Sequence, residues 1–291
     1  MKNYEKKLTE RELLDIYSIM FSVAYADGEL DKEELKVIFE YINTENFSEN
    51  GKQEIKNFLV SPPDFYAVLE RMKNYKKEIQ YTAYLNGIDV AYANDIITSD
   101  QENLFKYLRK ELNINDEQDK EIRNFVLKMK KIRERGLNDE YAKDTIKTAI
   151  SGLSAVGVPI TAIYFSGSVV GLSAAGITSG LAALGLGAGM VPGIGTAILL
   201  GVTVFMILAK ILDIGDKRKK EKFQKERERR AEQVIKNLQE TINDLIERIE
   251  ILEKKADDSE ANKKAVEQLT KRITLLKQII ENKKRGIEYA E

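Results

Sequence analysis

The side chains best suited to chemistry in this chain are carboxylates, and two pairs of them recur at one spacing. Asp27 precedes Glu34 by seven residues in the stretch "VAYADGELDKEEL", which begins at residue 23. Asp95 precedes Glu102 by the same seven residues in a similar stretch, "VAYANDIITSDQENL", which begins at residue 90. Hard divalent cations such as Ca²⁺ prefer oxygen ligands, carboxylates above all. The repeat therefore predicts a cation site at which two acidic turns face each other across a pseudo-two-fold axis.

A second interpretation of the same residues needs no ligand. Each copy has the pattern of a helix end, a turn and a helix start, and acids at a helix start are favoured by the helix dipole. The first copy is not an EF-hand, because a calcium loop starting at Asp27 would place Ile38 where the bidentate glutamate belongs. The spacing alone leaves both interpretations open.

The rest of the composition excludes most familiar enzymatic chemistry. The 291 residues include no cysteine and no histidine. Disulfides, thiol nucleophiles, Cys/His zinc sites and catalytic groups that need an imidazole are therefore excluded. The sequence also contains no recognisable phosphate-binding loop and no nucleophile placed beside a base. We expect a protein that is not an enzyme, with a divalent cation such as Ca²⁺ as its one cofactor.

The carboxylates lie in a first region, residues 8–134, whose pattern is helical. Apolar residues recur at helical spacing from Leu13 to Phe21, and no segment alternates with period two for long. The signals for helix starts are Thr9 with Glu12, Asp31 with Glu34, the early prolines of "SPPDFYAVLERM", Ser99 with Glu102, and Asn115 with Gln118. These signals predict a compact helical bundle.

The paired acidic turns in a small helical bundle resemble the tellurite-resistance TerB-like domain, over about residues 8 to 130. The resemblance implies a bundle that binds a divalent metal through acidic residues and works near membranes in stress responses and in resistance to phage or colicins. The ligands that it implies are Asp27, Glu34, Asp95 and Glu102. The second copy departs from the pattern, because Asn94 and Asp95 stand where the first copy has Asp27 and Gly28.

A long uncharged stretch follows the bundle. The 62 residues between Lys147 and Lys210 include no charged side chain. A membrane-spanning helix needs about 20 apolar residues. The stretch therefore predicts a helical hairpin with two spans, or three tight ones, in contact with the lipid bilayer. We place the two spans near "TAISGLSAVGVPITAIYFSGSVVG", residues 148–171, and "VPGIGTAILLGVTVFMILAKIL", residues 191–212.

Basic residues flank the uncharged stretch on both sides. Five precede it between residues 128 and 135, and nine more lie between Lys217 and Arg230. The positive-inside rule places both flanks, and so both termini, in the cytoplasm. The resemblance to TerB-like domains implies a bacterial protein, with the hairpin in the inner membrane. Acids are mixed into the second run and few aromatic residues interleave it. This pattern favours anchoring to anionic lipid, and we expect no nucleic-acid partner.

Glycines give the uncharged stretch a packing pattern. The G-x-x-x-G pairs are Gly167 with Gly171, Gly176 with Gly180, and Gly189 with Gly193. Close approach of helix backbones across small residues drives association in lipid. We expect these glycines to pack helices within one hairpin or between copies of the chain, with some of them forming a turn.

The C-terminal region has heptad spacing. The first set of heptad residues is Ile235, Leu238, Ile242, Leu245, Ile249 and Leu252, and the pattern resumes with Val266, Leu269, Ile273, Leu276 and Ile280. Two amphipathic helices with a short polar break predict a coiled coil, formed either within one chain or between subunits. We expect a homo-oligomer.

The sequence therefore predicts an all-α protein in three parts. Residues 1–134 form the TerB-like bundle, residues 135–215 the glycine-rich membrane hairpin, and residues 216–291 a basic juxtamembrane helix and coiled coil. The expected function is that of a membrane-anchored, non-enzymatic adaptor or sensor in stress response or in phage or colicin defence, with other cytoplasmic proteins as partners. The alternative is a regulated pore-forming effector that inserts its hydrophobic hairpin on a signal.

Overall fold

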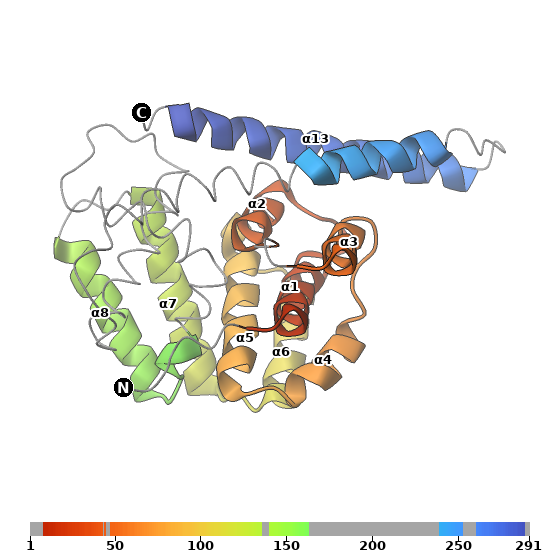
Figure 1. Ribbon diagram of the computed structural model, residues 1–291. Coiled ribbons are helices and arrows are strands. Elements are labelled where there is room, and N and C mark those ends of the chain that lie inside the picture. The colour runs from red at the N-terminus through yellow and green to blue at the C-terminus, as the bar shows by residue number, and fades with distance from the viewer. Residues whose placement is uncertain are drawn as a thin grey trace. The chain divides into compact units, whose positions relative to one another are not determined.

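The computed structural model describes residues 8–42, 44, 47–135, 140–162, 239–252 and 260–288 (Figure 1). Their regular secondary structure is entirely helical, which confirms the predicted all-α class. The helices are α1 (Glu10–Ala24), α2 (Lys32–Tyr41), α3 (Glu49–Phe58), α4 (Phe65–Lys73), α5 (Lys77–Ala91), the short 3₁₀ helix η1 (Tyr92–Asn94), α6 (Ser99–Leu112), α7 (Asp116–Arg135), α8 (Glu140–Ala155) and α13 (Glu260–Glu288). Residues 239–252 are also helical.

The chain divides into two compact units. Among the described residues, the first unit contains α1, α3 to α6, most of α2 and α7, and residues 149–162. The second unit contains the end of α2, the end of α7, the start of α8 and the C-terminal helices. We call the first unit the bundle.

Two helices form the centre of the bundle. α1 makes its most extensive contacts with α5, and smaller ones with α3 and α4. Residues 14–24 of α1 and residues 79–91 of α5 are buried without interruption. A helix that is buried on all sides needs apolar residues around its whole circumference or polar ones with internal partners.

The polar residues of these central helices bond to nearby backbone. The Ser18 hydroxyl donates to the Leu14 carbonyl and the Ser22 hydroxyl to the Ser18 carbonyl, each at 2.8 Å. Gln80 Nε2 lies 3.0 Å from each of three carbonyl oxygens at the end of α4, those of Met72, Lys73 and Tyr75. A glutamine of α5 therefore donates to carbonyls at and just beyond the end of α4, where helical partners run out.

The predicted helix starts are largely confirmed. Thr9 and Glu12 form a capping box at α1, and Asn115 and Gln118 exchange hydrogen bonds of 3.0 and 2.8 Å at the start of α7. The predicted cap of α6 is wrong by one residue. Thr98, not Ser99, is the N-cap, and Gln101, not Glu102, completes the capping box.

The uncharged stretch begins in α8 and does not continue as one helix. α8 ends at Ala155, and Gly157 follows with a φ of 79°. The Gly157 amide donates to the Ser154 carbonyl at 3.1 Å and the Val158 amide to the Leu153 carbonyl at 3.0 Å. These two bonds are the Schellman motif that stops a helix, with Gly157 at the left-handed position. The expected continuous span over residues 148–171 is therefore interrupted at its centre.

None of the helices in the described parts of the chain is both long enough and apolar enough to cross a membrane.

The C-terminal helices bury much of the predicted heptad pattern. The heptad residues with less than a tenth of their surface exposed are Ile242, Leu245, Leu269, Ile273, Leu276 and Ile280. Ile249, Leu252 and Val266 are partly exposed, and Ile235 and Leu238 lie outside the described residues. Helix formation in these segments is confirmed, while their pairing as a coiled coil stays a prediction.

Candidate functional site

The two repeated stretches form matching turns between consecutive helices. The first turn links α1 to α2 and contains Gly28 with a φ of 90°. The second links α5 to α6 through η1 and contains Asp95 with a φ of 65°. Glycine adopts such left-handed backbone freely, and aspartate is among the few other residues that tolerate it. Gly28 and Asp95 are therefore equivalent positions, each five residues beyond the valine that opens its copy.

This equivalence corrects the register of the predicted acid pairs. The counterpart of Asp27 is Asn94, and the counterpart of Glu34 is Gln101. The second copy therefore carries amides where the first carries carboxylates. Asp95 and Glu102, which the seven-residue spacing had matched to the first copy, each lie one position further along.

Glu34 and Gln101 contact each other, as equivalent side chains do at a two-fold axis. Gln101 Nε2 donates to Glu34 Oε1 at 2.7 Å, and it also lies 3.4 Å from the Val23 carbonyl oxygen at the end of α1. The Asp31 amide lies 3.4 Å from Glu34 Oε2. Glu34 is 3% exposed and Gln101 is 1% exposed. The joint between the two copies is thus a buried carboxyl group held by an amide.

The surroundings of Glu34 change its acidity. Burial raises the pKa of this carboxyl to about 7, and the negative charges of Asp27 and Asp31 act in the same direction. The hydrogen bonds from Asp31 and Gln101 oppose the shift but do not cancel it. A carboxyl group with this pKa changes its charge near neutral pH, which an exposed glutamate does not do.

The other three predicted cation ligands are not part of this buried contact. Asp27 and Asp95 are exposed in their turns. Glu102 accepts two hydrogen bonds from Arg123 of α7, at 3.0 and 3.2 Å. Among the described residues, no three His, Cys, Asp or Glu side chains come close enough together to hold a metal ion. The structure therefore does not assemble the four carboxylates into one cation site.

Arg123 belongs to a network that joins α5, α6 and α7. Asp119 accepts from the Tyr84 hydroxyl at 2.6 Å, from Arg123 Nε at 2.8 Å and from Arg109 Nη1 at 3.0 Å. Arg123 also stacks over the Phe105 ring, 5.5 Å from its centroid. Charge-assisted hydrogen bonds of this kind fix helices relative to one another. We assign the network a structural role.

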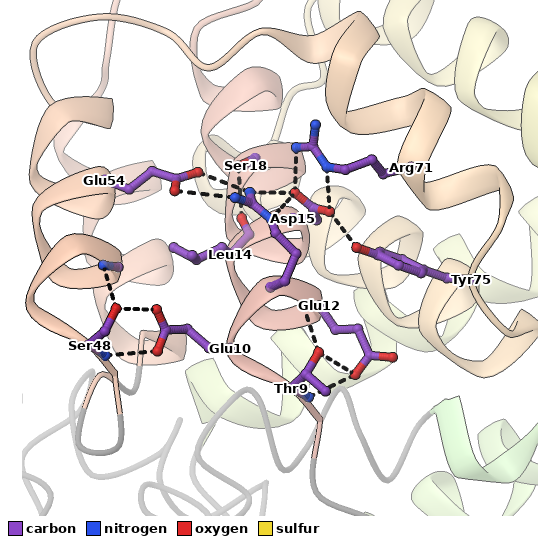
Figure 2. A network of polar contacts seen from close by, with 12 residues as sticks. Thr9, Glu10, Glu12, Leu14, Asp15, Ser18, Ser48, Glu54, Arg71 and Tyr75 are labelled. Carbon is purple, nitrogen blue, oxygen red and sulfur yellow. Dashed lines mark hydrogen bonds and ion pairs between the residues drawn. The ribbon is translucent and has the colours of Figure 1, made fainter.

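A second network surrounds Asp15 in α1, and sequence patterns did not point to it (Figure 2). Asp15 is fully buried and accepts from Arg11, Arg71 and the Tyr75 hydroxyl at 2.6 to 3.1 Å. Burial acts to raise the pKa of the Asp15 carboxyl, but these hydrogen bonds outweigh burial and hold its pKa below the ordinary value. Arg11 continues the network to Glu54 of α3.

The start of the uncharged stretch forms the third polar contact region of the bundle. We call residues 149–162 the docked segment. Gln118 Nε2 of α7 donates to the Val156 carbonyl at 3.1 Å. The Thr82 hydroxyl of α5 lies 3.2 Å from the Ala162 carbonyl and 2.6 Å from that of Glu78. The apolar side chains of the segment that are almost fully buried are Ala149, Ile150, Leu153, Val158 and Ala162.

The predicted packing glycines Gly167, Gly171, Gly176, Gly180, Gly189 and Gly193 lie outside the described residues.

No known protein family, curated protein or solved structure matches this chain.

Proposed function

We propose that this protein is a membrane-associated, non-enzymatic adaptor or sensor of a bacterial stress response or of defence against phage or colicins. The observation that carries the proposal is the docked segment. The first residues of a long uncharged stretch are held by α5 and α7 of the bundle. A change in the bundle can therefore act directly on the part of the chain with the composition of a membrane segment.

The Glu34–Gln101 joint supports a sensing role for the bundle. Its charge depends on pH near neutrality, and it joins the two halves of the repeat. α5 belongs to the same repeat, because it precedes η1 and α6, and its residue Thr82 contacts the docked segment. We propose that the state of this joint is communicated to the docked segment through α5.

Binding of a divalent cation such as Ca²⁺ by Asp27, Glu34, Asp95 and Glu102 stays a prediction. Calorimetry on the full chain tests it. Heat that disappears in Asp27→Asn with Glu34→Gln would support a cation site in the first turn. An absence of heat in the wild type would leave these acids with capping and ion-pairing roles only.

A regulated pore-forming effector is the second candidate. It is favoured by the burial of Ile150, Leu153 and Val158, because a hydrophobic segment kept against its own bundle suits insertion on a signal. The two candidates differ in the resting state. An adaptor anchored in the inner membrane stays there constantly, whereas an effector of this kind is recovered from the soluble fraction until it is triggered.

Fractionation of bacterial cells that express the full chain tests the proposed function. We expect the chain in the inner-membrane fraction after carbonate extraction, and a variant lacking residues 163–210 in the soluble fraction. Recovery of both chains in the soluble fraction, with and without stress, would contradict membrane association.

Labelling of cysteines introduced near each terminus of this cysteine-free chain tests the predicted cytoplasmic location of both ends.

A further inference from the structure

The docked segment places part of the uncharged stretch in a protein environment instead of a lipid one. Five of its apolar side chains are at most 3% exposed. Lipid tails are about as apolar as leucine, so such side chains are shielded from water equally well by a bilayer or by a protein face. The apolar side chains of the segment therefore favour neither location strongly.

The polar contacts, in contrast, exist only in the docked state. Gln118 and Thr82 both act on backbone carbonyls of the segment, those of Val156 and Ala162. The Val156 carbonyl follows the end of α8, where helical partners are missing, whereas Ala162 lies in the short helical stretch 160–162. In a continuous membrane helix the Val156 carbonyl would accept from an amide of the next turn. Gln118 thus replaces a hydrogen bond that a longer helix would supply. Thr82 adds a longer contact to the segment, because its hydroxyl lies closer to the Glu78 carbonyl, at 2.6 Å, than to that of Ala162, at 3.2 Å.

The Schellman motif acts together with these contacts. Its bonds at Gly157 and Val158 stop α8 in the middle of the expected span. A helix that crosses the hydrocarbon layer needs about 20 residues without such a break. While the motif is present, residues 148–171 do not form one spanning helix.

We propose that the bundle retains the docked segment and releases it when the uncharged stretch enters a membrane. On release, the segment leaves Thr82 and Gln118, and α8 extends through Gly157. This proposal rests on the proposed membrane association and adds to it the contact that controls entry. The partner of the released segment is the lipid bilayer.

A cleavable link between the segment and α7 tests the proposal. A Cβ atom at Gly152 would lie 2.7 Å from Glu121 Oε2, so the two positions are in contact. The chain has no cysteine, so Gly152→Cys with Glu121→Cys supplies a unique thiol pair. A short bis-maleimide with a reducible centre then joins them, and reduction separates the same molecules again. Efficient linking is itself expected from the docked geometry, and failure to link would overturn the proposal.

The readout is flotation of the full chain with vesicles of phosphatidylethanolamine and phosphatidylglycerol. A high-salt wash removes protein that is bound to the vesicles only through its basic residues 217–230, because at 1 M salt the screening length is about 3 Å. We expect the linked protein to lose wash-resistant flotation and to regain it on reduction. A control pair within α3, Gln53→Cys with Asn57→Cys, should float equally before and after reduction.

The outcomes distinguish controlled release of the docked segment from membrane association of the chain. Equal flotation of the linked and reduced forms would overturn controlled release while membrane association stands. Absence of flotation in both forms and in the wild type would overturn membrane association, and controlled release with it.

Discussion

Glu34 is a single carboxyl group on which burial and hydrogen bonding act in opposite directions. Burial and the charges of Asp27 and Asp31 raise its pKa, and the bonds from Asp31 and Gln101 lower it. The net pKa of about 7 lies above the ordinary value of 4.5. The folded protein therefore binds this proton more tightly than the unfolded chain does.

The sign of the resulting pH dependence follows from this difference. The contribution of Glu34 to stability is fully present below pH 4.5 and is lost as the pH rises to about 7. The loss amounts to about 3 kcal/mol, at roughly 1.4 kcal/mol for each pKa unit. We expect Glu34→Gln to remove this dependence in urea unfolding, and Asp27→Asn to reduce it in part. Parallel stability curves for the wild type and Glu34→Gln over this range would contradict the assignment.

Asp15 is the opposite case, a buried carboxylate stabilised by its partners. Asp15→Asn would leave Arg71 and Tyr75 facing a neutral amide in the place of a charge. Both arginines that contact Asp15 are about two-fifths exposed, so solvent offsets part of the loss. We expect the free energy of unfolding to fall by about 2–3 kcal/mol.

Glu54→Gln is the matched control for this measurement. It alters the outer contact of Arg11, at a carboxylate that is 37% exposed. We expect it to cost less than about 1 kcal/mol. Equal losses of unfolding free energy in the two variants would show that burial of Asp15 does not increase its contribution to stability.

At the scale of helices, local sequence predicted the starts of α1, α2, α4 and α7, placed that of α6 one residue late, and did not predict those of α3 and α5. The cap of α6 was misplaced because Thr98 and Ser99 are both good N-caps, and each has a suitable partner three residues later. Local preference does not separate the two choices. The contact of Gln101 with Glu34, 67 residues away in the chain, selects Thr98. The Asp15 network was missed for the same reason, since Arg71 and Tyr75 lie 56 and 60 residues from Asp15.

The Schellman motif at the end of α8 depends on one glycine. Any residue that replaces Gly157 must adopt left-handed backbone, which costs about 1–2 kcal/mol for an ordinary residue. Gly157→Ala should therefore weaken the Schellman motif and favour an extended helix. We expect faster hydrogen exchange across residues 149–162, measured by mass spectrometry.

Gly28→Ala supplies the comparison for this variant. Gly28 also has a positive φ, and neither glycine has an atom within 4 Å of an added Cβ. The two substitutions thus introduce similar local strain in different turns. Faster exchange of residues 149–162 in Gly28→Ala as well would indicate general loss of stability and not release of the docked segment.

At the scale of the whole molecule, hydropathy alone did not distinguish a protein interior from a bilayer. Residues 149–162 have the composition of a membrane span, yet they pack on the bundle. Both environments bury apolar side chains, so the absence of charge fits either one. The informative signal in the sequence was Gly157. A glycine with a proline two residues later, here Pro159, marks a helix end.

Self-association is the second prediction at this scale. Leu245 is fully buried in the C-terminal helices, whereas Ile251 of the same helical segment is 45% exposed. If copies of the chain assemble through the heptads, Leu245→Asp lowers the subunit number in mild detergent and Ile251→Asp leaves it unchanged. Light scattering on the eluted protein gives the mass. A monomeric wild type would contradict assembly.

The central claim is that the bundle's hold on residues 149–162 controls membrane entry, and one substitution tests it with little disturbance elsewhere. Gln118 Oε1 accepts from the Asn115 amide in the cap of α7 while its Nε2 holds Val156. Gln118→Glu keeps the cap, since glutamate serves that position equally well, and removes only the donor to the docked segment.

Flotation of the full chain with anionic vesicles should rise roughly fivefold, the equivalent of one neutral hydrogen bond. Gln53→Glu on α3, which makes the same change of charge, should leave flotation unchanged. Equal flotation of wild type, Gln118→Glu and Gln53→Glu would contradict the claim.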